Sequence, residues 1–401
     1  MIILSIYYLF IKDFNKNLLN LTDMTLLYKN KIKIIFFFII IILSLISIIH
    51  SFNESQKHSY DFHYYPAKLV SEGINHYQYV LDGKHDRGPS DRMLYYQDGI
   101  YGHGLFIVLL PLTLLDWNTA KTVWAFLNIL FCFFILFFLR KKFCLSKKIF
   151  VLSACLFLMS TPLRINISYG QQTLFTFLFF LLPFIFQGKI SILLSGLSYF
   201  KYNIGYALFI YIFSLKNLNK VLISLIPCIV GWLSYAYITN TSALKNLFEP
   251  ILVLSHFFSI KNHLPVTIFS LLKEIGFNNY LVMAIPLILS FLVIYKLKKV
   301  KNDLFKLSIV CLVSLSFTAH QLHDYILLLP LLIFSLINFN LLVSKINLIV
   351  IFYFFFFLRV VSLFFNFMPW DFPYGYFGYF NNSLIILILF LNFKNLKIKF
   401  K

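Results

Sequence analysis

Long apolar runs, separated by short polar segments, dominate the hydrophobic pattern of this 401-residue chain. Runs of roughly 15 to 22 residues with few charges have the length of membrane-spanning helices. The clearest runs lie at 34–50, 118–139, 149–163, 171–187, 221–238, 279–296, 304–319, 325–339, 346–364 and 383–393. The pattern therefore predicts an all-α, polytopic membrane protein.

Two further apolar segments need separate treatment. The run GLFIVLLPLTLL at 104–115 has twelve residues and contains a proline, so an interfacial or re-entrant helix fits it better than a crossing. The segment 190–215 is either a hairpin that turns at 199–203 or one long span. With the hairpin, the chain has about twelve membrane helices.

The charges set the orientation. The net charge is +20, and most Lys and Arg lie in short segments between the apolar runs, as the positive-inside bias requires. We therefore assign 1–33 and the basic tail 394–401 to the cytoplasm, and 34–393 to one membrane domain. The hairpin is preferred because it keeps KNLNK (216–220) on the cytoplasmic side.

This topology leaves the segments 51–117, 240–278 and 365–382 on the outer face. The first holds eight of the fifteen acidic residues: Glu54, Asp61, Glu72, Asp82, Asp86, Asp91, Asp98 and Asp116. All ten histidines also lie on or near this side. The five cysteines form no CxxC pair, and no nucleotide-binding or hydrolase motif occurs in a credible context. Polar chemistry is therefore expected at the outer face of a bacterial-type cell membrane.

Four polar groups stand out there. Asp61, in SYDFHYYPAKLVSEG, is either the N-cap of a helix or a general base for a substrate hydroxyl. Lys201 lies between two apolar stretches, so it must reach the membrane surface or pair with an anion. The segment SYGQQ (168–172) offers amide donors. In HQLHD (320–324), the spacing HxxHD is a weak metal signal, because two histidine ligands have no evident third. Hydrogen bonding to a phosphate or sugar is preferred for this turn over polarity without function.

Taken in order, these segments resemble glycosyltransferase family 87, multi-spanning enzymes of the GT-C superfamily that use polyprenyl-phosphate sugars. The matching pieces are the pattern D-x-x-x-Y-x-A-x-x-x-x-x-G-x-x-x-Y from Asp61, the runs GLFIVLLPLTLL and VWAFLNIL, the stretch from GQQ to Lys201, and SFTAHQLHDY. The resemblance covers roughly residues 34–340. The family's lysine is usually followed by proline, whereas Tyr202 stands here.

The resemblance implies a GT-C-like bundle in which Asp61 is the catalytic base. It places Lys201, His320, His323, Asp324, Gln171 and Tyr65 around the donor phosphate and sugar. The implied reaction moves a hexose or pentose, with mannose favoured, to a lipid or glycan acceptor and needs no cofactor or metal. A transporter or lipid flippase, and a glycan polymerase of the cell envelope, are the alternatives. The sugar and the acceptor stay open.

Overall fold

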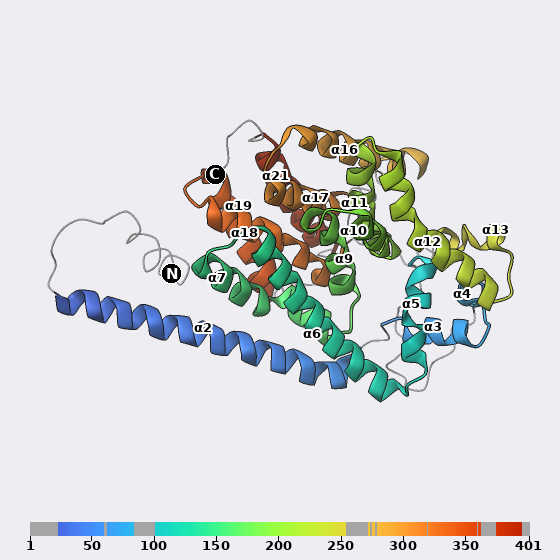
Figure 1. Ribbon diagram of the computed structural model, residues 1–401, viewed down its shortest axis with the longest axis horizontal. Helices are drawn as coiled ribbons and strands as arrows, with labels where there is room; N and C mark the ends of the chain where they lie inside the picture. Colours follow the sequence, from blue (N-terminus) through green and yellow to red (C-terminus); the bar gives the residue numbers. More distant parts are fainter. Residues whose placement is uncertain are drawn as a thin grey trace.

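A computed structural model describes residues 23–59, 62–83, 101–253, 272, 275–276, 279–318, 320–358, 360–361 and 374–394. Within these ranges the chain forms helices and the turns between them, with no strand, which confirms the all-α class. The helices shown in Figure 1 are α2 (Asp23–His58), α3 (Tyr64–Ser71), α4 (His76–Leu81), α5 (His103–Thr113), α6 (Trp117–Lys142), α7 (Lys147–Leu158), α8 (Thr161–Ser168), α9 (Thr173–Ile185), α10 (Lys189–Ser195), η2 (Gly196–Phe200), α11 (Tyr202–Ser214), α12 (Leu218–Ile238), α13 (Ala243–Asn246), α16 (Asn279–Lys296), η3 (Leu297–Lys299), α17 (Asp303–Phe317), η4 (Leu322–Leu328), α18 (Leu329–Ile337), α19 (Leu342–Phe352), η5 (Tyr353–Phe357) and α21 (Tyr374–Lys394).

Three helices of the described part are long and apolar enough to cross a membrane: α2 over Phe37–Lys57, α6 and α12. They match the predicted spans at 34–50, 118–139 and 221–238. The predicted span at 149–163 corresponds to the pair α7 and α8, which meet at a bend of 55° and are together apolar enough for one broken span. The Ser160 hydroxyl caps α8 by accepting from the Leu163 N–H, and Pro162 starts that helix but cannot continue α7.

The predicted span at 279–296 corresponds to α16, with 18 residues, and that at 304–319 to α17, with 15 residues. Others correspond to shorter apolar helices of 10–17 residues. Examples are α9 for the span at 171–187, and η4 with α18 for the span at 325–339. By length, the described helices therefore account for three crossings, or four with the bent pair, and not for all twelve. The run at 104–115 forms the short helix α5, with Pro111 inside it, as the sequence predicts.

The segment 190–215 folds back on itself. Lys201 has a non-helical backbone (φ −99°, ψ 81°) and separates η2 from α11. A Cβ at Gly205 would meet the Ser198 carbonyl oxygen and approach the Tyr199 Cα to 2.7 Å, so α11 packs directly on η2. The segment is therefore broken at Lys201 and is not one continuous helix, and its two membrane crossings stay a prediction.

Two apolar cores hold the helices together. The larger lies within the body formed by α6, α9, α11, α17, α18 and α21. The smaller joins α3, α4 and α5 to the start of α6 and the end of α12. In that second core α5 and α12 touch backbone to backbone, because a Cβ at Gly231 would overlap the Gly104 backbone. Close approach of small residues of this kind is common between membrane helices.

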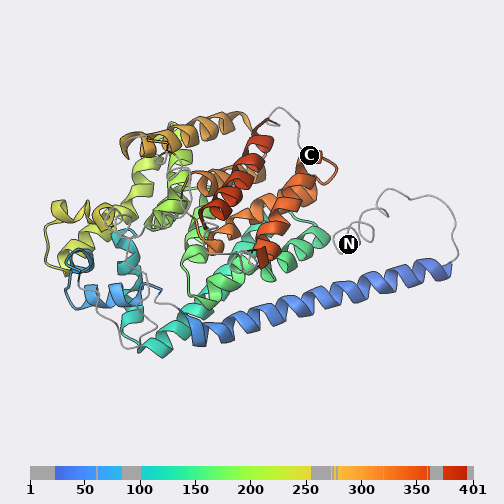
Figure 2. The same ribbon diagram turned by 180° about the vertical axis from the view of Figure 1, so that it is seen from behind.

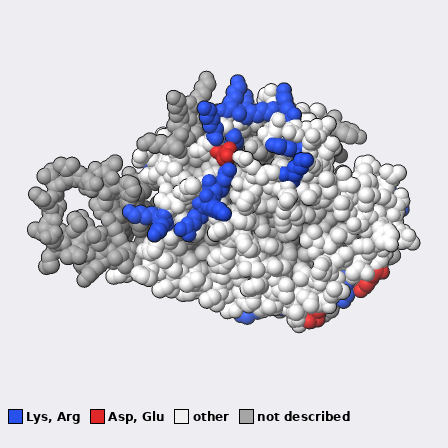
Figure 3. All heavy atoms as spheres, viewed as in Figure 1, with Lys and Arg blue, Asp and Glu red and all other residues white. Residues whose placement is uncertain are grey.

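Helix α2 lies along one side of the body and extends beyond it, as Figures 1 and 2 show from opposite sides. Its outward residues are apolar and exposed, among them Ile42, Ile46 and Ile49. Lys and Arg gather around α16 and α7, where Asp303 pairs with Lys142 and Lys306, and other visible acidic residues lie near the start of α6 and near α3 (Figures 1 and 3).

Candidate functional site

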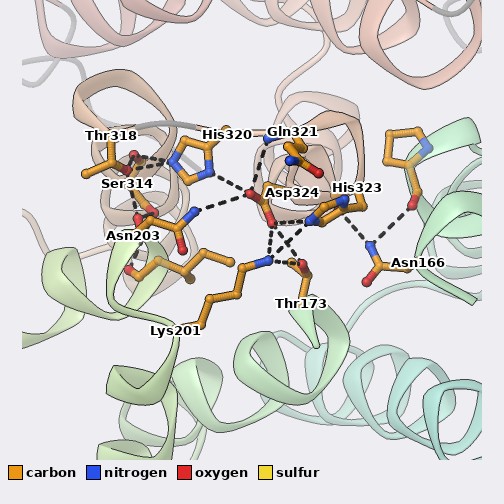
Figure 4. Close-up of polar contacts among 12 residues, drawn as sticks. Asn166, Thr173, Lys201, Asn203, Ser314, Thr318, His320, Gln321, His323 and Asp324 are labelled. Atoms are coloured by element: carbon orange, nitrogen blue, oxygen red, sulfur yellow. Dashed lines mark hydrogen bonds and ion pairs between the residues drawn. The ribbon is translucent and has the colours of Figure 1, made fainter. Parts of the chain in front are cut away.

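Four of the predicted site residues meet inside the helical body. Lys201 approaches from the break between η2 and α11, while His320, His323 and Asp324 come from the start of η4 (Figure 4). Lys201 and Asp324 are each only 1% exposed. The residues are more than a hundred positions apart in sequence, so the fold, and not local structure, assembles this charged cluster.

The Lys201 ammonium group is fully engaged. Its Nζ lies 2.7 Å from Asp324 Oδ1, donates to Thr173 Oγ1 at 2.6 Å, and is 3.3 Å from His323 Nε2. Thr173 also donates to Asp324 Oδ1, at 2.8 Å. An ammonium group has three donors, and three partners surround it here. Lys201 thus contacts an internal carboxylate and no lipid surface in this conformation.

Asp324 is held by both of its oxygens. Its Oδ2 is 3.0 Å from His320 Nδ1 and accepts longer bonds from Asn203 Nδ2 and from the backbone N–H of Gln321, both at 3.4 Å. The last bond belongs to a capping box, in which Gln321 and Asp324 begin η4 reciprocally. The local sequence QLHD therefore aims the carboxylate inward, where Lys201 compensates its charge.

His320 links the cluster to the neighbouring helix. Its Nε2 lies 2.7 Å from the Thr318 hydroxyl and 2.8 Å from the Ser314 carbonyl oxygen. Thr318 also donates to the carbonyl oxygen of Asn203, at 2.8 Å, which fixes the first turn of α11 to the end of α17. On the other side, Asn166 of α8 donates to the His323 carbonyl oxygen at 2.7 Å. The cluster thus joins α8, α9, α11, α17 and η4.

Asp61 lies outside the described residues, as does Tyr60. The residue that follows, Phe62, is fully buried and stacks on Trp124, with 5.2 Å between ring centroids. The Trp124 indole donates to the carbonyl oxygen of Gly170 at 2.8 Å, directly before Gln171. A Cβ at Gly170 would lie 3.5 Å from that of Phe62, and the positive φ of +66° also favours glycine. The outer-loop motif and SYGQQ are therefore neighbours.

A second connection runs through Tyr101. Its ring centroid is 5.6 Å from Lys201 Nζ and 4.9 Å from the centroid of His63. His63 directly precedes α3 and adopts the left-handed conformation, with φ of 66°. Tyr101 lies in the polar stretch LDGKHDRGPSDRMLYYQDGIYGHG of the sequence (81–104) and was not among the predicted site residues. It places an aromatic face between the outer-loop motif and the lysine.

Gln171 and Tyr65 stand apart from the charge cluster. The backbone N–H of Gln171 bonds the Asn166 carbonyl oxygen, and its side chain is largely buried. Tyr65 is half-buried on α3, a helix that packs against α5. Sequence reasoning missed Thr173, Asn203, Thr318 and Tyr101. The signal for Thr173 was available, because it directly follows GQQ, but a lone Thr at a helix start is ordinary.

Metal binding has no geometric basis in the described ranges, where no three His, Cys, Asp or Glu side chains converge as ligands would. In HxxHD, the two histidines approach different oxygens of Asp324, and Lys201 shares one of them. No known protein family, curated protein or solved structure matches this chain.

Proposed function

We propose that this chain is an integral membrane glycosyltransferase of the GT-C type. It transfers a hexose or pentose, mannose favoured, from a polyprenyl-phosphate sugar to a glycolipid or glycan acceptor on the outer face of the cell membrane. The observation that supports this most is the convergence of the four motif segments. Thr173, directly after SYGQQ, meets Lys201 and Asp324 of HQLHD in one cluster. The segment after Asp61 contacts SYGQQ through Phe62 and Trp124, and Tyr101 lies between His63 and Lys201.

The wider architecture of the proposal is a bundle of about twelve membrane helices with short interfacial helices at its outer end. The chain has apolar helices throughout its described part, and α3, α4, α5 and α13 gather at one end of the body (Figures 1 and 2). A lipid-linked donor needs such a place, since its polyprenyl chain stays in the bilayer while its sugar reaches water.

The proposed reaction is a single displacement. Asp61 accepts the proton of the acceptor hydroxyl while that oxygen attacks the anomeric carbon, and the bond from this carbon to the phosphate oxygen breaks. The products are the glycosylated acceptor with inverted configuration and polyprenyl phosphate, which leaves with the bonding electron pair. Phosphate is a good leaving group, so the step requires stabilisation of its charge but no further reactant.

The resemblance assigns that stabilisation to Lys201, His320 and His323. The structure adds a condition to this assignment, because Asp324 already pairs with Lys201 at 2.7 Å. A phosphate would have to displace a buried carboxylate before it could contact the ammonium group. In the absence of such a displacement, the cluster serves to hold the motif segments together.

A transporter or lipid flippase is the second candidate, and one observation favours it. Ionisable groups buried within apolar helices, as Lys201 and Asp324 are, often belong to substrate or proton pathways. An enzyme and a transporter differ in product. Only an enzyme yields a new glycosidic bond when detergent-solubilised protein, with no two compartments to transport between, is given donor and acceptor.

The test is a transfer assay with purified protein, radiolabelled polyprenyl-phosphate mannose and a membrane lipid extract. Asp61→Asn should bind donor but transfer sugar at least ~100-fold more slowly, the typical lower bound for losing a general base. Asp82→Asn is the matched control, because Asp82 is an exposed acid of the same predicted outer segment, and its carboxylate accepts from Gln78 of its own helix turn. Wild-type transfer by Asp61→Asn would remove the base assignment, and no transfer from any polyprenyl-phosphate sugar would remove the enzyme.

A further inference from the structure

A cavity of about 340 Å³ lies between the outer part of α2 and helix α8. Most of its lining is polar and comes from His50, Glu54, Thr161, Arg164, Ser168 and Tyr169. None of the residues of the charge cluster line it. Its volume is within the range of about 300–1,000 Å³ that small-ligand sites occupy. Ser168 and Tyr169 belong to the SYGQQ segment, but the cavity as a whole could not be predicted, because α2 and α8 are separated by more than a hundred residues.

Arg164 gives the cavity its chemistry. The residue is half-buried on α8, its Nη2 donates to Thr161 Oγ1 at 3.3 Å, and its carbonyl oxygen accepts from the Ser168 hydroxyl at 2.7 Å. A guanidinium group is planar and presents a fork of donors that matches phosphate oxygens. Among the lining residues Arg164 supplies the cation and Glu54 the carboxylate, and Glu54 pairs with Lys57 of its own helix at 3.6 Å. The donor fork of Arg164 is thus the feature of the lining that suits an anionic ligand.

The surroundings of the cavity indicate that the anion is attached to a lipid. Ile46 and Ile49, on the turn of α2 just before the cavity, are 55% and 60% exposed. In a polytopic chain such an apolar face lies against bilayer lipid. A polyprenyl chain can therefore lie along α2 while its head enters the cavity, whereas a free phosphate would gain nothing from this face.

We infer that this cavity binds the phosphate head of the polyprenyl-linked donor, with Arg164 as the phosphate ligand; the inference rests on the proposed function and refines it. Lys201, neutralised by Asp324, then acts as a positioning residue. The bond from Asn166 to the His323 carbonyl oxygen ties α8 to the cluster from the side opposite the cavity. The Ser168 hydroxyl, the Glu54 carboxylate and the His50 imidazole of the lining can hydrogen-bond the hydroxyl groups of the sugar.

The experiment measures binding in the absence of acceptor, so it does not depend on transfer. Wild-type protein in phosphatidylcholine nanodiscs is titrated with undecaprenyl phosphate, with phosphatidylglycerol, and with inorganic phosphate. Undecaprenyl phosphate should bind at least tenfold more tightly than either of the other two. Equal binding of phosphatidylglycerol or of inorganic phosphate would overturn the assignment of the cavity to the donor.

The variants then test Arg164. Arg164→Gln should weaken undecaprenyl phosphate binding about tenfold or more, because it removes a charge-assisted phosphate contact. The affinity of Arg164→Lys should lie between those of wild type and Arg164→Gln. Arg140→Gln is the matched control: this arginine lies at the far end of α6, over the Phe150 ring at 4.8 Å. Unchanged affinity in Arg164→Gln overturns the inference while leaving the proposed enzyme intact.

A third measurement covers the case in which Arg164→Gln does not fold. Wild-type protein is photo-crosslinked with a diazirine-bearing polyprenyl phosphate and digested, and the labelled peptides are identified by mass spectrometry. Label should fall on peptides of α2 and α8. Label confined to other helices overturns the inference, whether or not sugar transfer has been observed.

Discussion

Removal of the Lys201 charge should destabilise the protein far more than removal of any surface lysine. Lys201→Met keeps most of the aliphatic stem but leaves the Asp324 carboxylate buried without its ammonium partner. Loss of one partner from a buried ion pair costs about 3–5 kcal/mol of unfolding free energy. The pair here is 2.7 Å apart with both residues 1% exposed, so the upper part of that range is expected.

The double variant distinguishes a lost pair from a lost side chain. Lys201→Met combined with Asp324→Asn removes both charges, while the amide can still interact with His320 and Thr173. We expect it to be more stable than Lys201→Met alone, because the uncompensated carboxylate is gone. The sum of the unfolding free energies lost in the two single variants should therefore exceed the loss in the double variant by about 0.5–3 kcal/mol, the usual coupling between residues in contact.

The assay is thermal unfolding in detergent, followed by the fraction of protein that stays monodisperse after heating. Lys245→Met is the control, since Lys245 is exposed on α13 and should be replaced at almost no cost. Additive single effects, or a Lys201→Met variant as stable as wild type, would show that Lys201 and Asp324 do not form a coupled pair.

Three other perturbations follow from the packing. The side-chain amides of Asn347 on α19 and Asn392 on α21 bond each other reciprocally at 3.1 and 2.8 Å. Asn392→Leu should therefore lower the free energy of unfolding by about 0.6–1.7 kcal/mol, measured as a loss of thermal stability in detergent. A neutral effect would show that the amide pair contributes nothing. Gly231→Leu should abolish monodisperse expression, because the new side chain would meet the α5 backbone, and normal expression would refute that contact. In a cysteine-free background, Glu72→Cys should react with an impermeant maleimide added to intact cells and Lys298→Cys should not, with the reverse pattern inverting the topology.

The long apolar elements could be predicted from the sequence because hydrophobic length is a property of the sequence alone. The spans that became α2, α6 and α12 are long runs of high mean hydropathy with few charged residues. The predicted span at 149–163 became a bent pair because Ser160 and Pro162 act locally as a cap and a helix start. Hydropathy along an apolar run does not predict such a break, although the serine and proline that cause it can be read in the sequence.

The charge cluster could be predicted only in part. A lysine between two apolar stretches requires a partner, so Lys201 was identifiable, as was the crowded turn HQLHD. Their pairing was not, because nothing local relates residue 201 to residue 324. Thr173 and Asn203 were missed for the same reason, because each contacts Asp324 only in the folded protein.

Whether Lys201 can bind a lipid phosphate depends on which group compensates its charge. From the sequence, either a lipid phosphate or an internal acid could compensate its charge, and the two require opposite environments. A phosphate ligand must be open to the membrane, whereas Lys201 is enclosed by three internal partners. The capping box of Gln321 and Asp324 contributes to that enclosure locally, because it holds the Asp324 side chain at the start of η4. Because the Lys201 charge is already compensated by Asp324, the proposed phosphate site needs another cation. Arg164 lines a cavity beside the apolar face of α2 and would supply that cation to a lipid-linked phosphate.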